Sequence, residues 1–425
     1  MSHTLQFAPE RDAELFAAVP AKPAVFLLRP ESGEPYISKT ANLRRRLIRL
    51  LGKRDEHSRL LTLRDRAREI EYFPTGSDFE SGLLLYKLLR REFPKSYRDR
   101  LRLRPAPLVK FHWENEYPRV SVTTQLGRNS PSAGHEGNLY YGPFASRASA
   151  EKFSNDALDF FKLRRCVDDL HPDPAFPGCI YSEMKMCLAP CFRGCSDDEY
   201  LAEATRVQAF FDSRGQSLAR ELSALRDRAS EQLAFEEAAA LHTRIEKLQP
   251  VLAQLPEITR RIDRLDGLMI QPSAESDSVN LFRIHAGCMG DVIPFPVSIH
   301  TAVAPAGQTQ GTVVASPKHV SMEARILASL ASTPEPDCPS RLEVSEQIAM
   351  LKRWYFRSNK TGELFLADSN GELPMRRIVR AVARVFRGEK PAADLSESTR
   401  DYWVNRGREV ELNSSEAEPN VSKDQ

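Results

Sequence analysis

The sequence contains no run of about 18 apolar residues, which is the length that a membrane-spanning helix needs. Its first residues, MSHTLQFAPERDAEL, include acidic side chains and no apolar segment of the kind found in secretory signals. We therefore predict a cytoplasmic protein without a membrane partner. The hydrophobic content of 41% is still enough for packed cores, and a length of 425 residues predicts several domains.

The chain also has little net charge, +2 at neutral pH, so the overall balance indicates no class of partner. The distribution is more informative, because residues 44–110 contain 19 Lys and Arg against 9 Asp and Glu. Such a local excess favours a surface that faces phosphates. The alternative is a solvated helical face whose charge is balanced elsewhere in the fold.

Cysteine is scarce outside one segment. Five of the seven cysteines fall within 30 residues, at positions Cys166, Cys179, Cys187, Cys191 and Cys195. Without an export signal, such a cluster favours metal ligation over disulfides. Thiolates suit zinc or an iron–sulfur cluster, and spacing alone does not distinguish the two. Unligated buried thiols are the alternative, although the neighbouring prolines leave them no evident packing role.

Apolar and alternating segments predict a small α/β unit near the start of the chain. Strands are predicted at 24–30, 35–40 and 69–75, where branched and aromatic residues gather. Asn42 is a suitable N-cap for a helix with leucines on one face, and a second amphipathic helix is predicted at 77–93.

Beyond this unit, strands and helices follow in separate stretches. Strand-like alternation follows Pro105, and leucines at helical spacing over 196–255 predict an antiparallel helical hairpin. Strand patterns return between Ile258 and Val303, and further helices follow, including a basic helix at 375–387. The last 17 residues are polar and predict a disordered tail.

Three short motifs resemble the middle of the UvrC proteins of DNA excision repair. Tyr140–Phe144 has the sequence YYGPF, Leu163–Cys166 is LRRC, and Cys187–Cys191 is CLAPC. In that family the matching cysteines carry a 4Fe–4S cluster. The resemblance implies, with zinc as the alternative metal, the ligands Cys166, Cys179, Cys187 and Cys191. It leaves Cys195 as an extra thiol outside the ligand set.

The order of the first strands and helices also resembles the GIY-YIG nuclease domain at the N-terminus of UvrC. In that family two tyrosines, a helix arginine and a glutamate surround the scissile phosphate, and the glutamate holds a divalent metal. The matching catalytic positions that keep family residues are Tyr36, Lys39 and Arg46. Phe26 replaces the first tyrosine, and Tyr86 replaces the glutamate.

The missing carboxylate argues against Mg²⁺ or Mn²⁺ at this site, and against cleavage by it. Glu80 is the nearest acid. Because Ser77-x-x-Glu80 has the form of a helix capping box, we favour that role over metal binding. Lys39 and Arg46 still suit backbone phosphates. Whether the chain is an enzyme stays open at this point.

Residues 225–248 resemble the UVR motif, the hairpin through which UvrC meets UvrB. The Phe-Glu-Glu-Ala-Ala core is present, although His242-Thr243 departs from the usual Arg-Asp pair. The resemblance implies that Phe235, Glu236 and Glu237 bind a UvrB-like protein, with the aromatic ring as anchor and the acids guiding the encounter. A hairpin packed within its own chain is the alternative.

Together these patterns predict an α+β multidomain protein. The expected parts are a degenerate GIY-YIG nuclease-like domain (15–103), a linking region with the cysteine cluster (104–200), a UVR-like hairpin (201–255), a C-terminal α+β region of unknown role (256–408) and the disordered tail (409–425). The resemblance is loose over 256–300 and absent beyond, with no match to the RNase H-like or helix-hairpin-helix domains of UvrC. The run from Trp354 to Arg357 is expected in the core rather than on nucleic acid.

Three hypotheses of function remain. The first is a UvrC-like DNA-binding protein of nucleotide excision repair that interacts with UvrB, with impaired or absent endonuclease activity. The second is an active single-incision GIY-YIG DNA endonuclease in which Glu80 or another acid restores the metal site. The third is a structural iron–sulfur or zinc protein that binds nucleic acid outside excision repair.

Overall fold

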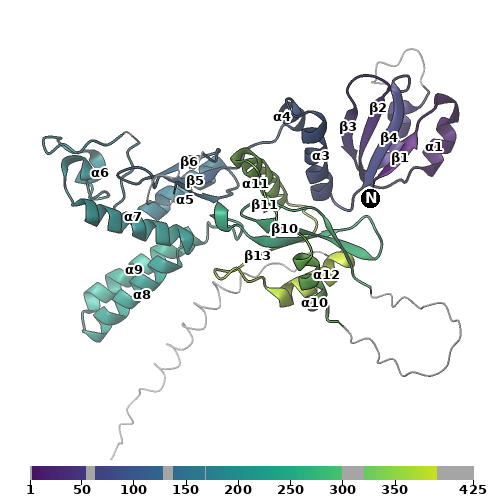
Figure 1. The fold of residues 1–425 in the computed structure, drawn as a ribbon. Coiled ribbons are helices and arrows are strands. Elements are labelled where there is room, and N and C mark those ends of the chain that lie inside the picture. Colours follow the sequence, from purple (N-terminus) through teal and green to yellow (C-terminus); the bar gives the residue numbers. More distant parts are fainter. Residues whose placement is uncertain (1, 54–62, 128–136, 168, 299–319, 390–425) are drawn as a thin grey trace, which may run out of the picture.

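The computed structural model describes residues 2–53, 63–127, 137–167, 169–298 and 320–389. These residues form three β-sheets with their helices, and a projecting helical hairpin (Figure 1). The mixture of sheets and helices in several domains confirms the predicted α+β multidomain class. The predicted tail at 409–425 and the end of the predicted C-terminal region lie outside the described residues.

The first sheet is antiparallel, with the strand order β1-β4-β2-β3. The elements of this domain are β1 (His3–Gln6), a 3-10 turn (Pro9–Arg11), α1 (Asp12–Ala18), β2 (Ala24–Pro30), β3 (Tyr36–Thr40), α2 (Leu43–Leu51), β4 (Ala67–Pro74), α3 (Asp78–Glu92) and α4 (Tyr97–Leu101). The central strand β2 is buried on both faces. Phe26 and Leu28 lie in the core with α2, whereas Val25 and Leu27 pack against α3. β3 is an edge strand.

The predicted strands and helices of this domain are confirmed to within one or two residues. Asn42 caps α2 as predicted, because its side chain accepts a hydrogen bond from the Arg45 amide. The sequence did not predict β1 and α1, and β1 extends the sheet ahead of residue 15. With four residues, β1 is too short for its pattern to identify a strand.

The second sheet belongs to the middle of the chain and has the order β6-β5-β7-β8. Its elements are β5 (Leu108–Phe111), β6 (Val120–Thr123), β7 (Leu139–Gly142), α5 (Arg147–Leu158), α6 (Ile180–Glu183), a 3-10 turn (Pro190–Phe192), α7 (Asp197–Asp212) and β8 (Arg260–Arg261). Aromatic side chains join α5 to α7: the ring of Phe210 contacts those of Phe153 and Phe161. β8 follows the hairpin in sequence, so the chain returns to this sheet after leaving it.

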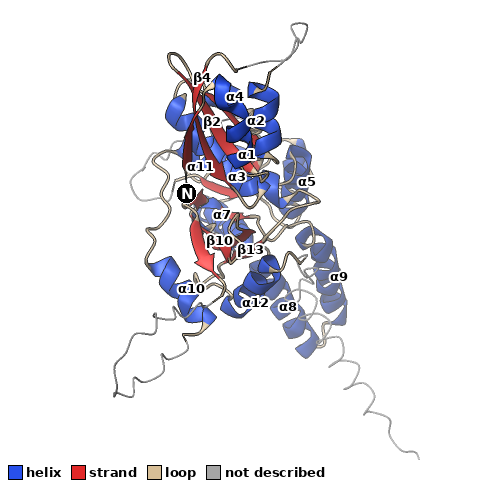
Figure 2. Cartoon of the chain, turned by 90° about the vertical axis from the view of Figure 1, so that its right-hand side faces the viewer, coloured by secondary structure: helices blue, strands red, loops and turns tan. Residues whose placement is uncertain are grey.

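The hairpin consists of α8 (Gln216–Glu231) and α9 (Phe235–Leu252), and it confirms the antiparallel pair predicted from leucine spacing. Both views show it pointing away from the sheets (Figure 2). Leu222 and Ile245 are buried as the pattern predicts, whereas Leu233 lies in the turn with 71% of its surface exposed. Helix α7 precedes the pair, so the predicted helical stretch contains three helices.

The third sheet has the order β11-β10-β9-β13, and β12 also pairs with β10. Its elements are a 3-10 turn (Ile262–Arg264), β9 (Gly267–Pro272), β10 (Ser278–His285), β11 (Cys288–Met289), β12 (Ile293–Pro296), α10 (Met322–Ala331), α11 (Arg341–Tyr355), β13 (Glu363–Leu366) and α12 (Met375–Phe386). One face of the sheet packs against α11 and α3, and the other packs against α10 and α12. Helix α3 therefore lies between two sheets, as Figure 1 shows.

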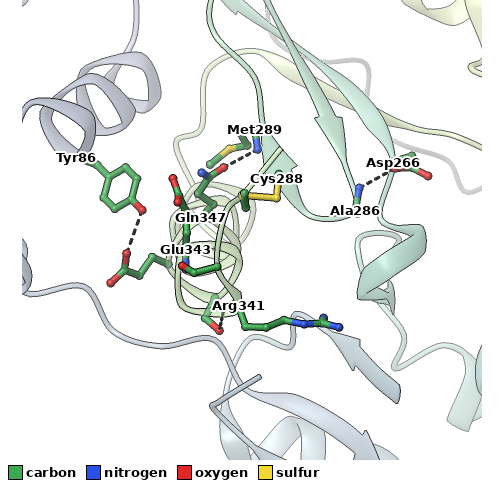
Figure 3. Close-up of a disulfide and its surroundings, with 12 residues drawn as sticks. Tyr86, Asp266, Ala286, Cys288, Met289, Arg341, Glu343 and Gln347 are labelled. Atoms are coloured by element: carbon green, nitrogen blue, oxygen red, sulfur yellow. Dashed lines mark hydrogen bonds between the residues drawn. A yellow bond between two sulfur atoms is a disulfide. The ribbon is translucent and has the colours of Figure 1, made fainter. Parts of the chain in front are cut away.

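A disulfide joins the two cysteines that lie outside the cluster. Cys288 of β11 is bonded to Cys338, which precedes α11 (Figure 3). Nearby, Trp354 is buried as predicted, but Phe356 is 37% exposed and Arg357 is exposed, so the expected core position holds only for the start of this run. Among the described residues, no helix is both long and apolar enough to cross a membrane.

Candidate functional site

Three of the positions that match the nuclease pattern lie together on one face of the first sheet. The Tyr36 hydroxyl, on β3, accepts a hydrogen bond of 3.0 Å from the Arg46 guanidinium, on α2. The Phe26 ring is fully buried, 6.1 Å from the Tyr36 ring. Phe26 carries no hydroxyl, so Tyr36 provides the one phenol of this trio. The site therefore retains a cation and a phenol, but only half of the expected phenol pair.

Lys39 is not part of this group. Successive residues of a strand point to opposite faces, so Lys39 lies on the α3 side of β3, whereas Tyr36 packs on the α2 side. Its ammonium group donates to the Asp78 carboxylate at 2.6 Å, at the start of α3. The structure thus separates Lys39 from the Tyr36–Arg46 pair.

Tyr86 occupies the place of the expected metal-binding glutamate, and it faces away from the first sheet. The residues around it, Leu84, Leu85 and Leu88, pack toward β2. Tyr86 itself is 1% exposed and donates to the Glu346 carboxylate of α11 at 3.0 Å (Figure 3). Burial, aided by Glu346, raises the pKa of this phenol. This position holds no carboxylate and does not point at Tyr36 and Arg46.

Glu80 serves to cap α3, as the sequence predicts. The Ser77 hydroxyl accepts from the Glu80 amide at 3.1 Å, and the Glu80 carboxylate accepts from the Gly76 amide at 2.7 Å. The second bond reaches one residue further back than in the usual capping box. Burial raises the pKa of Glu80, since the Gly76 amide only partly compensates for lost solvation.

The cysteine cluster lies in an irregular segment between α5 and α7. None of its five thiols forms a disulfide, and all are half-buried. Burial raises the pKa of Cys187 to about 11, and the neighbouring thiols of Cys166, Cys191 and Cys179 add to this effect. Burial also raises the pKa of Cys195, and the carboxylates of Glu199 and Asp197 at the start of α7 add to this effect.

Two contacts orient the predicted ligands. The Arg164 guanidinium, on a residue only 2% exposed, lies 3.5 Å from the Cys166 sulfur, and the Ala189 amide donates to the Cys187 sulfur at 3.3 Å. The Ala189 amide only partly offsets the burial that raises the pKa of Cys187, and soft metals bind cysteine as the thiolate.

The donor chemistry of the four thiols therefore fits zinc or an iron–sulfur cluster. Across the described residues, however, no three His, Cys, Asp or Glu side chains are already arranged to hold a metal ion. The four thiols are near neighbours rather than a finished coordination shell, and the cofactor stays a prediction.

The tip of the hairpin is apolar and accessible. Phe235 is 65% exposed at the first residue of α9, beside the exposed Leu233, and Glu236 and Glu237 are exposed next to it. The predicted partner-binding residues thus share one accessible surface. This exposure is compatible with an anchor for another protein.

A cleft lies between the first domain and α11, and no sequence pattern predicted it. This cavity has a volume of about 560 Å³, and its lining includes the end of β3, the first half of α3, the end of α11 and the residues that follow α11. Asp78 and Arg357 meet there through a hydrogen bond of 2.6 Å between residues 279 positions apart. The exposed Arg357 at the end of the Trp354 run was the one available signal.

Comparisons with known proteins agree with the motifs of the middle region. The family model described as UvrC/Cho excinuclease, middle domain, matches residues 107–210, from the start of the second sheet to α7. The chain is 29% identical to UvrABC system protein C of Rickettsia bellii (strain RML369-C) over 265 residues, which cover 62% of this chain and 40% of the relative. With the corresponding protein of Symbiobacterium thermophilum, the identity is 27% over 278 residues, or 64% and 42% of the two chains.

The chain spans about 40% of the length of these curated relatives. No solved structure matches it significantly.

Proposed function

Because this chain is UvrC-like, we propose that it is a DNA-binding protein of nucleotide excision repair whose N-terminal site does not cut DNA. The orientation of Tyr86 carries the second part of the proposal. A divalent metal at a phosphodiester needs hard oxygen ligands, and the position that would supply one holds a buried phenol turned toward α11. Tyr36 and Arg46 remain able to contact a phosphate without a metal.

The alternative of an active single-incision endonuclease requires another acid in the place of the missing one. Glu80 is engaged in capping α3, and Asp78 is bound by Lys39 and Arg357. Neither acid contacts the Tyr36–Arg46 pair. These contacts favour the non-cleaving function over the alternative.

Incubation of the purified chain with Mn²⁺ and a nicked or lesion-bearing duplex tests this proposal. The expected result is binding without cleavage. Mn²⁺-dependent cleavage that Tyr36→Phe abolishes would instead establish the single-incision endonuclease, because it would place the chemistry at this site.

The partner in this proposal is a UvrB-like protein, bound through the tip of the hairpin. Support comes from the exposure of Phe235 and its acidic neighbours and from the resemblance of residues 225–248 to the UVR motif. An aromatic side chain surrounded by charge is a common anchor at protein interfaces.

The cofactor in this proposal is a 4Fe–4S cluster, or alternatively zinc, held by Cys166, Cys179, Cys187 and Cys191. Such a group would cross-link the irregular segment between α5 and α7. Anaerobic purification should yield a coloured, iron-containing chain. Cys187→Ser should lose the iron, whereas Cys195→Ser should keep it. A colourless chain loaded with zinc would exclude the iron–sulfur cluster and leave the ligand set in place.

The third hypothesis, a structural metal protein outside excision repair, predicts different DNA binding. Phosphate contacts weaken steeply with salt, since each releases counterions. Weak DNA binding that does not depend on salt would favour this third hypothesis over the first.

A further inference from the structure

The cleft between the first domain and α11 combines a basic lining with an apolar floor. Five cationic residues line it: Lys39, Arg100, Arg353, Arg357 and Lys360. Asp78 is the one acid among the described lining residues. These cations come from three separated parts of the sequence, so only the fold assembles them.

The cleft already binds an anion that belongs to the chain itself. The Asp78 carboxylate accepts from the Lys39 ammonium at 2.6 Å and from the Arg357 guanidinium at 2.6 Å. Both cations come from outside α3, and they hold the carboxylate from two different domains. All three side chains are partly exposed, so an anion from solution can compete for the two cations.

The floor of the cleft is aromatic. Trp354 packs edge-on against Phe79, and its indole nitrogen donates to the Thr361 carbonyl, which fixes the ring. The Lys360 ammonium lies 5.5 Å from the centre of the Trp354 ring and 4.4 Å from that of Tyr355. Proteins that bind single-stranded nucleic acids combine cations and aromatic rings in a groove. The cations contact the phosphates, and the bases pack against the rings.

We propose that this cleft binds single-stranded DNA, with Arg353, Arg357 and Lys39 on its phosphates and the apolar floor against a base. A cavity of about 560 Å³ is in the size range of sites for single small molecules, so it admits a nucleotide but not a duplex. A second cavity of about 510 Å³ also borders Lys39 and Arg100 and continues past Tyr36. The two cavities therefore share lining residues, and Tyr36 is among the residues that line the second.

This inference rests on the proposed function, because it names the surface that binds DNA. When a strand binds, one of its phosphates replaces the Asp78 carboxylate as the partner of Lys39 and Arg357. Asp78 thus competes with the strand, and this competition gives the inference its sharpest test.

The first experiment measures the affinity of the full chain for a short fluorescein-labelled oligothymidylate by anisotropy, over a range of salt. Arg353→Ala/Arg357→Ala should weaken binding by about tenfold or more. The slope of log affinity against log salt should become shallower by about 1.4, because two phosphate contacts are lost.

The matched control is Arg376→Ala/Arg380→Ala, which removes two exposed arginines from the outer face of α12. It changes net charge by the same amount and should weaken binding by less than about threefold. Equal weakening by the two double variants would show that binding follows overall charge. It would contradict the proposal that the cleft is the binding site. Wild-type affinity in Arg353→Ala/Arg357→Ala would overturn it as well.

The second experiment uses Asp78→Asn, which removes the competing anion while keeping the size of the side chain. Binding of the oligothymidylate should become about threefold tighter or more, since Lys39 and Arg357 are released. A residue with only a structural role would give the opposite change, because its loss would loosen the cleft. Unchanged or weaker binding overturns the inference.

A duplex of the same length distinguishes the failure of this inference from that of the proposed function. Binding of the duplex that exceeds binding of the single strand, and that is insensitive to the cleft variants, would overturn the cleft and leave a DNA-binding protein. A chain that binds neither probe would contradict the proposed function itself.

Discussion

Tyr86 places a phenol where the nuclease resemblance calls for a carboxylate, and its surroundings suit a phenol. The side chain is 1% exposed, and its hydroxyl donates to Glu346, which also accepts from the Tyr97 hydroxyl at 3.0 Å. Arg98 lies 3.3 Å from the same carboxylate. A buried charge is tolerated when it is paired and hydrogen-bonded in this way. The residue therefore serves packing between domains rather than metal binding.

Restoring the family residue by Tyr86→Glu should not restore cleavage. The new carboxylate would lie against Glu346 in a buried place, which we expect to lower the free energy of unfolding by about 3 kcal/mol or more. Thermal unfolding and a Mn²⁺-dependent cleavage assay measure the two effects. The control Tyr86→Phe loses the hydrogen bond to Glu346 and the one from Arg90, and it should cost about 1–2 kcal/mol. Cleavage by Tyr86→Glu would contradict the orientation of this side chain.

His112 gives a second prediction at the scale of one residue. Burial, with the charges of Lys110, Arg119 and Arg164, lowers its pKa from 6.5 to about 3. Because the folded pKa lies below the unfolded one, protonation favours the unfolded chain. The contribution of neutral His112 to stability is present above pH 6.5 and is lost as the pH falls toward 3.

The loss amounts to at most about 1.4 kcal/mol per pH unit in this window. Chemical denaturation between pH 7 and 4 measures the slope. His112→Gln keeps a polar partner for the Ser121 hydroxyl, which lies 2.7 Å from the His112 ring, and it should flatten the slope. Equal slopes in the two chains would be inconsistent with a neutral, half-buried imidazole.

At the scale of elements, the hairpin shows two kinds of apolar residue on the same helix. Ile245 of α9 is 2% exposed inside the core that α9 shares with α8, whereas Phe235, at the first position of α9, is 65% exposed. Large exposed apolar side chains that cluster at a projecting tip are typical of interaction sites. Stability and partner binding should therefore depend on different residues of one helix.

Substitutions in α9 test this division. Phe235→Ala should leave the free energy of unfolding within about 0.5 kcal/mol of wild type but weaken binding of a UvrB-like protein by about tenfold or more. Ile245→Ala should cost about 2–5 kcal/mol of stability. Denaturant unfolding and calorimetric titration give the two quantities. Leu327→Ala, at an exposed apolar residue of α10, is the control for binding. Full binding by Phe235→Ala would exclude the tip as the anchor.

At the scale of the whole molecule, α3 joins the first domain to the third sheet. Leu84, Leu85 and Leu88 of this helix pack toward β2. Its opposite face carries other side chains into the core of the third sheet: Phe79, Leu83, Tyr86 and Leu89. Glu346 accepts hydrogen bonds from two tyrosines of the first domain and is close to Arg98. This contact holds in place one wall of the proposed DNA cleft.

Loss of the contact between Glu346 and the two tyrosines should make the first domain unfold separately from the domain of the third sheet. Glu346→Ala leaves the hydroxyls of Tyr86 and Tyr97 without their shared acceptor, at a cost of about 2–4 kcal/mol. Calorimetry should then show an earlier transition of the first domain. Glu363→Ala is the matched control, since its partner Arg384 belongs to the same domain. One unchanged transition in Glu346→Ala would argue against this role of the contact.

Local patterns determined much of the secondary structure. Branched residues placed β2, leucine spacing placed α2, α8 and α9, and the capping residues Asn42 and Ser77 fixed two helix starts. These features are set by neighbours along the chain, through hydrogen bonds and periodic burial, so the sequence alone could reveal them. The motifs around the cysteines likewise identify the middle region without any reference to the fold.

Features that depend on contacts between residues distant in the sequence became apparent only from the tertiary structure. Tyr86 turns toward α11, β8 joins a sheet that begins 152 residues earlier, and Lys39 and Arg357 share Asp78 across 318 positions. No local preference encodes such pairings, because they arise only when separate elements bury their apolar faces against one another. For this reason the cleft was found in the structure, whereas the elements that form its walls could be read from the sequence.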